Sequence, residues 1–129
     1  MKRWIMDKKI IFFDIDRTIY DPDTRSIPQS TIDALKQLNE REDIEIAIAT
    51  GRAFYMLHII EEIIDYINIF VLINGQIIIK DGQTIYRNPI DKKDVLEVVK
   101  ILDENQMKYG FLGEFDETLN IVNWISASA

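Results

Sequence analysis

The chain has 129 residues, of which 47% are hydrophobic and 29% are charged, and its formal net charge at pH 7 is −7. This composition is that of a globular domain with a hydrophobic core, and it excludes an intrinsically disordered chain. The acidic balance argues against nucleic acid or an anionic membrane surface as a partner. The chain has no cysteine, which excludes disulfides, thiolate nucleophiles and cysteine-ligated metal sites.

The first two thirds of the chain alternate between strand and helix patterns. Residues 9–13 are typical of a strand that is buried on both faces. Residues 26–29 fit a capping box that opens a helix extending to about residue 41. A strand, a helix and a strand are then predicted at residues 44–49, 53–66 and 69–73. This β-α-β-α-β order predicts an α/β fold with a Rossmann-like, three-stranded parallel sheet.

Each of the two helices is expected to bury one apolar stripe. The first stripe comprises Ile32, Leu35 and Leu38. The second comprises Phe54, Leu57 and either Ile60 or Ile64.

The pattern changes after Asn74 and Gly75. Residues 77–79 and 84–86 predict a β-hairpin whose turn contains a glycine. Asp91 can cap a helix that extends to about residue 104, and two short strands are predicted at residues 108–112 and 119–125. We therefore predict a first domain at residues 1–86 and a smaller α+β piece at residues 87–129.

The apolar run at residues 59–71 is interrupted by Glu61, Glu62 and Asp65, so no membrane span is predicted. The N-terminal apolar stretch at residues 10–13 is too short for a signal peptide. We expect a cytoplasmic protein.

Polar groups follow two neighbouring strands of the predicted sheet. Asp14 and Asp16 follow the first strand, and Thr50 and Gly51 follow the second, directly before a helix. Ligands of open α/β sheets bind at this edge. Two carboxylates so close together raise each other's pKa unless a cation such as Mg²⁺ compensates them. Such a pair can supply a nucleophile for phosphorus and a general acid, while Thr50 can bind phosphoryl oxygens.

These residues resemble a known family. Residues 12–19, FFDIDRTI, resemble motif I of the haloacid dehalogenase superfamily, hhhDxDGT. Residues 47–52, AIATGR, resemble motif II of its Cof-type, or class IIB, branch of sugar and cofactor phosphatases, and Asn74-Gly75 also resembles that branch.

The resemblance implies a Mg²⁺-dependent phosphate monoester hydrolase that acts on a sugar phosphate or a similar small metabolite. Asp14 would be the nucleophile and Asp16 the general acid and base. The Asp14 carboxylate and the Asp16 main-chain carbonyl would contact the metal. Thr50 and the Gly51 amide would contact the phosphate. Residues 1–86 would be the N-terminal half of the core, and residues 87–129 would be part of a cap domain.

Two further residues are candidates for phosphate binding, namely Thr18 and Arg52. Arg52 equally suits a packing or loop-contact role. Arg17 departs from the family pattern, which has glycine at its position.

The larger departure is length, since members of this branch are about twice as long. Their second half supplies a lysine and an acidic pair, whereas four lysines of this chain fall in the cap-like region, at positions 92, 93, 100 and 108. We therefore expect weak activity or none from this chain alone. The edge of the strand at residues 10–13 would lack a neighbour, which predicts a homo-oligomer formed through that edge.

Two alternatives to an enzyme stay open. One is a non-catalytic fragment that serves for binding or regulation. The other is a receiver-like phosphoacceptor domain, but this class carries its aspartate at the end of the third strand, where Asn74 stands.

Overall fold

The computed structural model describes residues 7–114 and 117–119. The chain divides into two compact units, Met1–Arg87 and Asn88–Ala129. No helix in the described part of the chain is long and apolar enough to cross a membrane.

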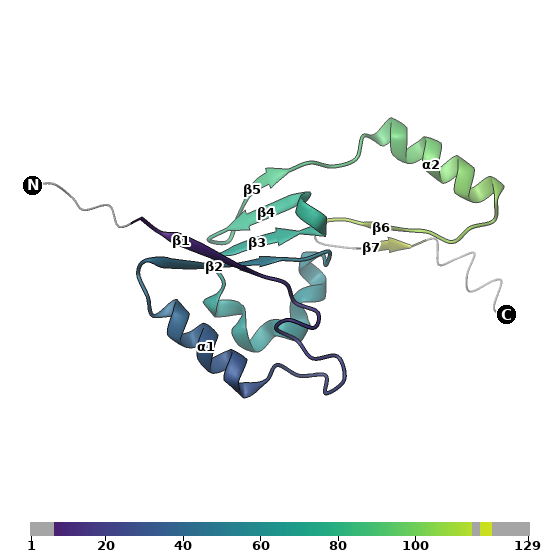
Figure 1. Ribbon diagram of the computed structural model, residues 1–129. Helices are drawn as coiled ribbons and strands as arrows, with labels where there is room; N and C mark the ends of the chain where they lie inside the picture. Colours follow the sequence, from purple (N-terminus) through teal and green to yellow (C-terminus); the bar gives the residue numbers. More distant parts are fainter. Residues whose placement is uncertain (1–6, 115–116, 120–129) are drawn as a thin grey trace, which may run out of the picture. The chain divides into compact units, whose positions relative to one another are not determined.

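The first unit contains a five-stranded sheet in the order β1-β2-β3-β4-β5 (Figure 1). Its strands are β1 (Lys9–Phe13), β2 (Ile44–Ala49), β3 (Ile69–Leu72), β4 (Ile77–Lys80) and β5 (Gln83–Arg87). The first three strands are parallel, whereas β4 and β5 form an antiparallel hairpin beside β3. The predicted α/β fold with a parallel three-stranded sheet is therefore confirmed.

Two helices cover one face of this sheet, α1 (Gln29–Asn39) and η1 (Phe54–Tyr66) (Figure 1). The hydrophobic core lies between them and the strands, and its fully buried members include Leu35 of α1 and Ile46 and Ile48 of β2. Ile32 and Leu38 are partly buried against this core, so the predicted stripe of the first helix is confirmed.

The beginning of α1 differs from the predicted capping box. The N-cap is Pro28, which has no side-chain hydrogen bond to the helix. The Ser26 hydroxyl instead lies 2.9 Å from the Thr24 hydroxyl, and the main chain of Ser26 pairs with that of Asp21. These loop contacts occupy the serine that the capping box required. The helix also ends at Asn39, two residues before the predicted end.

The second helix is a 3₁₀ helix with a kink at Ile60. Its buried residues are Leu57, Ile60 and Ile63, a spacing of three that matches three residues per turn. Phe54, predicted to face inward, is exposed at its side chain, although its ring packs edge-on against Phe70 with the centroids 6.4 Å apart.

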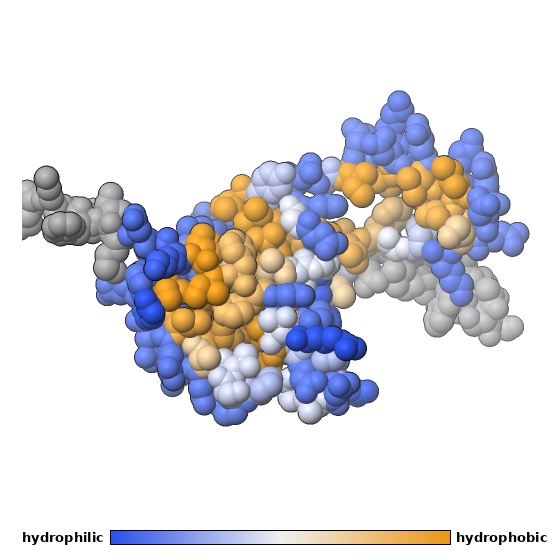
Figure 2. Space-filling view, in the orientation of Figure 1, coloured by the Kyte–Doolittle hydropathy of each residue, from blue (hydrophilic) through white to orange (hydrophobic). Residues whose placement is uncertain are grey.

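Strand β1 is not buried on both faces, contrary to the prediction. It lies at one edge of the sheet and pairs with β2. Ile10 is 45% exposed and Phe12 is 57% exposed, because α1 and η1 cover the opposite face. Figure 2 shows hydrophobic residues at the surface along this part of the unit.

The second unit contains α2 (Lys92–Glu104) and a two-stranded antiparallel sheet of β6 (Gly110–Leu112) and β7 (Glu117–Leu119). Asp91 caps α2 as predicted, since its side chain accepts a 2.8 Å hydrogen bond from the Lys93 amide. Of the strand predicted at residues 119–125, residues 120–125 lie outside the described residues.

Candidate functional site

The carboxyl ends of β1 and β2 bring the predicted nucleophile and phosphate-binding residues together. Phe13 pairs in register with Ile48, so Asp14 and Thr50 emerge from neighbouring parallel strands at the same edge. Asp14, Thr50 and Gly51 line one shallow cavity of about 430 Å³. The other lining residues are Ala49, Val71, Asn74 and Gly75.

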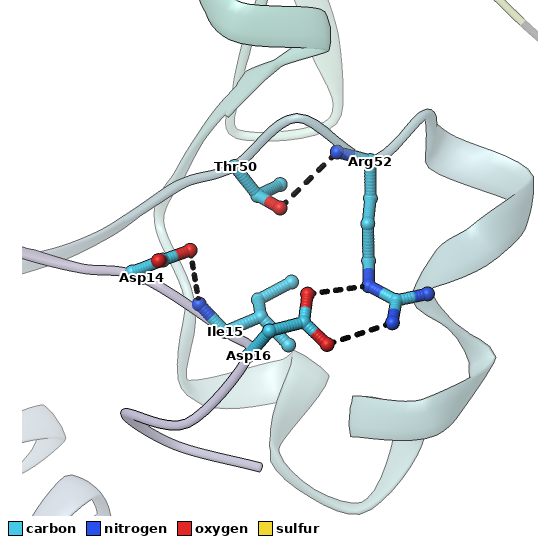
Figure 3. A network of polar contacts seen from close by, with 5 residues as sticks. All are labelled: Asp14, Ile15, Asp16, Thr50 and Arg52. Carbon is cyan, nitrogen blue, oxygen red and sulfur yellow. Dashed lines mark hydrogen bonds and ion pairs between the residues drawn. The ribbon is translucent and has the colours of Figure 1, made fainter. Parts of the chain in front are cut away.

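Asp14 presents an accessible carboxylate to this cavity. Its residue is exposed, and its Oδ1 accepts a 2.7 Å hydrogen bond from the Ile15 amide (Figure 3). That bond fixes the orientation of the carboxylate. A carboxylate with one oxygen held in this way can still offer an oxygen to a metal ion or to phosphorus.

Thr50 is the one described polar residue that is buried, with 7% of its surface exposed. Its Oγ1 accepts a hydrogen bond from the Arg52 amide at 3.1 Å. Since the hydroxyl is the acceptor in that bond, its own proton is available for donation. Thr50 can therefore donate to an anionic oxygen in the cavity.

Asp16 and Arg52, 36 residues apart in sequence, form a bidentate ion pair (Figure 3). Arg52 Nε and Nη2 lie 2.9 and 2.8 Å from the two carboxylate oxygens. The hydrogen bonds from Arg52 lower the pKa of Asp16, and the same bonds raise the pKa of Arg52. The structure thus places Arg52 against Asp16, and neither residue lines the cavity of Asp14.

Thr18 lines a different hollow, of about 340 Å³, together with Arg17, Tyr20 and Asp21. The structure therefore does not bring Thr18 into the cavity of Asp14. Arg17 has a φ of +66°, a left-handed backbone conformation that favours glycine. The residue that replaces the family's glycine is thus held in a conformation that glycine adopts more readily.

The donor set fits a Mg²⁺ ion that retains several waters. The Asp14 carboxylate lines the cavity and offers the oxygen atoms that this ion prefers. Within the described part of the chain there is no cluster of three or more histidine, cysteine, aspartate or glutamate side chains. Such a site would therefore be completed by water and by a phosphate oxygen.

Asn74 and Gly75 line the same cavity as Asp14, although they were not predicted as site residues. An ideal Cβ placed on Gly51 would lie 3.1 Å from the Asn74 Oδ1, so the asparagine side chain lies over that glycine. The signal was present in the sequence, because these residues directly follow the third parallel strand, at the edge where ligands bind.

Comparisons with known proteins agree with this geometry. A sequence profile of haloacid dehalogenase-like hydrolases matches residues 11–123. The Bacillus subtilis protein named "Putative phosphatase YkrA" is 39% identical over 110 residues, which are 84% of this chain and 41% of that protein.

Two solved structures are also similar to this chain. A protein from Geobacillus kaustophilus superposes with a TM-score of 0.78 at 29% identity, over 95% of this chain and 49% of that one. The subclass IIB sugar phosphatase BT4131 superposes with a TM-score of 0.77 at 27% identity, over 94% of this chain and 48% of that one. The chain thus spans about half the length of the proteins that it matches or less. With Asp14, Thr50 and Gly51 gathered at the carboxyl edge of its parallel strands, the chain belongs to the haloacid dehalogenase-like hydrolases.

Proposed function

We propose that the chain carries the nucleophile of a phosphate monoester hydrolase and its phosphate-binding loop, residues 50–52. The main support is that Asp14, Thr50 and Gly51 line one cavity. The substrate class that we propose is a sugar phosphate or a similar small metabolite, in line with the sugar phosphatase among the similar structures.

In this proposal Asp14 attacks the phosphorus and forms an aspartyl-phosphate. The Thr50 hydroxyl and the Gly51 amide donate hydrogen bonds to the phosphoryl oxygens. Asp16 gives a proton to the leaving oxygen and later takes one from water. A bound Mg²⁺, held by the Asp14 carboxylate and the Asp16 carbonyl, would offset negative charge at the phosphoryl group.

The pair of Asp16 and Arg52 has a consequence for this mechanism. A carboxylate held between two guanidinium hydrogen bonds stays ionised, and a general acid must carry a proton. We propose that Arg52 turns from Asp16 toward the phosphoryl oxygens when substrate binds. In that arrangement Arg52 would have the predicted phosphate-binding role, and Asp16 could be protonated.

The first test is hydrolysis of an aryl phosphate by the parent chain and by Asp14→Asn, with and without Mg²⁺. We expect activity to need the metal and to fall at least about a hundredfold in the variant, which loses its nucleophile. Asp81→Asn, the same chemical change in an exposed turn, serves as the control and should keep the parent rate.

Binding of beryllofluoride, which mimics an aspartyl-phosphate, is read by fluorine NMR and does not depend on turnover. We expect Mg²⁺-dependent binding to the parent and none to Asp14→Asn. Binding without turnover would favour the alternative, a fragment that serves for binding or regulation. Equal signals from the parent and Asp14→Asn would contradict the proposed nucleophile.

We also propose that two copies associate through the edge of β1. This strand pairs with β2 along one side, and Ile10 and Phe12 are exposed. Lys8 and Lys9 lie at the start of the strand and Asp14 and Asp16 follow its end, so antiparallel pairing of two copies would bring opposite charges together.

Sedimentation velocity tests this association. We expect the parent to dimerise in the range of tens of micromolar and Phe12→Asp to be monomeric. Ile101→Asp, at a residue equally exposed in the second unit, is the matched control and should dimerise like the parent. A monomeric parent would show that this edge is not an interface between copies.

A further inference from the structure

Three consecutive residues after β3 have left-handed backbone conformations. They form the short helical turn η2 (Ile73–Gly75), with φ values of +50° at Ile73, +54° at Asn74 and +90° at Gly75. Glycine and asparagine adopt this conformation readily, but for a β-branched isoleucine it is a strained outlier. Strain of this kind persists when surrounding contacts hold it, and it occurs most often at functional sites.

Two main-chain hydrogen bonds join this turn to the predicted phosphate-binding loop, residues 50–52. The Asn74 amide donates to the Thr50 carbonyl, and the Ile73 amide donates to the Arg52 carbonyl, each at 3.1 Å. The turn therefore binds the carbonyl groups on both sides of Gly51.

The bond to the Thr50 carbonyl also sets the direction of the Gly51 amide. In a planar trans peptide the N–H points opposite to the C=O of the preceding residue. The Thr50 carbonyl faces the Asn74 amide, so the Gly51 N–H points away from it. In the described part of the chain this N–H has no acceptor, which leaves it available to an anion.

The Asn74 side chain depends on Gly51 in turn. A Cβ at position 51 would lie 3.1 Å from Asn74 Oδ1, closer than most side-chain contacts allow. Any larger residue at position 51 would push the asparagine away from the loop.

We propose that Asn74 is a positioning residue for the phosphate-binding loop, because its left-handed backbone holds the Thr50 carbonyl and thereby aims the Gly51 N–H at the bound anion. The identity of that anion rests on the proposed function. The orientation of the loop does not.

The test compares Asn74 with Asp81, which have side chains of similar size and share the left-handed backbone conformation. Asn74→Ala replaces a residue at φ +54°, and Asp81→Ala replaces one at φ +49° in the exposed turn between β4 and β5. Both variants introduce similar backbone strain, so both should lose similar stability in urea unfolding. Asn74→Gly, which takes the left-handed conformation without strain, should restore the loop.

Affinity for inorganic phosphate in the presence of Mg²⁺ is measured by calorimetry, and the amide signals of Gly51 and Arg52 are followed by NMR. We expect Asn74→Ala to bind phosphate about three- to tenfold more weakly than the parent, the equivalent of one misdirected hydrogen bond. Asn74→Gly should recover most of this loss, and Asp81→Ala should bind like the parent. Equal affinity in Asn74→Ala and Asp81→Ala would overturn the proposal.

A parent chain that binds no phosphate would count against the proposed function and leave this inference to be decided by the amide signals. A shift of the Gly51 and Arg52 signals in Asn74→Ala, absent from Asp81→Ala and reversed in Asn74→Gly, would support the positioning role. Unchanged signals in Asn74→Ala would overturn it.

Discussion

Helices η1 and α2 each have thirteen residues and an apolar stripe, yet they differ completely in burial. In η1, Leu57, Ile60 and Ile63 are buried in the core of the first unit. In α2 no residue is buried, and Ile101 is 57% exposed. The same hydrophobic pattern therefore has different consequences, because a stripe stabilises a helix only where another surface covers it.

The comparison extends to the two units. The buried core cluster lies wholly within the first unit, between Ile15 and Ile79. In the second unit, none of residues 88–114 is buried. The first unit thus has the hydrophobic burial that supports independent folding, whereas residues 88–114 contribute no buried side chain.

Separating the units should produce the largest effect. A chain ending at Arg87 should retain a cooperative urea transition, with a free energy of unfolding within about 1 kcal/mol of the parent's, because its core is complete. A peptide of residues 88–129 should show no cooperative transition by circular dichroism, since none of residues 88–114 is buried and the chain has no cysteine. A cooperative transition in that peptide would refute this contrast.

Two matched truncations of isoleucine sharpen the comparison. Ile63 is fully buried in η1, so Ile63→Ala should lower the free energy of unfolding by about 2–5 kcal/mol. Ile101 is exposed in α2, so Ile101→Ala should change it by less than about 1 kcal/mol. Urea denaturation of both variants measures the difference, and comparable losses would show that α2 packs against a surface in solution.

The same dependence on a covering surface limits how much of the fold and of the site can be predicted from the sequence. Strand and helix positions follow from local patterns, and the meeting of Asp14 with Thr50 follows because both end parallel strands. The exposure of Phe12 could not be predicted. Its apolar run is typical of a strand that is buried on both faces, whereas only one face of this strand is covered. The ion pair of Asp16 and Arg52 could not be predicted either, because it joins two loops that are 36 residues apart in the sequence and meet only in the folded chain.

Backbone conformation is a second quantity that local patterns leave open. The hydrophobic pattern of η1 predicts a helix but not its 3₁₀ form, and the serine of the unused capping box contacts Thr24 and Asp21 of the preceding loop. Asn74 shows the opposite case, because Asn-Gly after a strand is a readable signal for a turn at the ligand edge.

Relief of left-handed strain should produce a smaller effect that also differs between the units. Arg17 has a φ of +66° in the first unit, so Arg17→Gly should stabilise it by up to about 1 kcal/mol. In the second unit, Gln106 has a φ of +54° and can be replaced by glycine in the same way. Gln106→Gly should leave the main urea transition in place, because that transition reports the core of the first unit. A loss of stability in Arg17→Gly would mean that the arginine side chain makes stabilising contacts that exceed the strain.

The smallest effect concerns an exposed ion pair in each unit. In the first unit Arg41 holds Asp43 through two hydrogen bonds of 2.9 and 2.7 Å, and these bonds lower the pKa of Asp43. In the second unit Lys100 and Glu104 approach only to 3.9 Å, one turn apart on α2. A bidentate pair should contribute more to stability than a single distant contact between flexible side chains.

The pH dependence of stability separates these pairs. Because the folded pKa of Asp43 lies below the unfolded value of about 3.9, its contribution is present above that pH and is lost as the pH falls through the folded pKa. Asp43→Asn should therefore be less stable than the parent at neutral pH, and the difference should disappear in strong acid. Glu104→Gln should match the parent at neutral pH, because an exposed pair at this distance contributes little. A difference between the parent and Asp43→Asn that stayed constant down to the lowest pH would show that the aspartate acts through its shape and hydrogen bonds rather than through its charge.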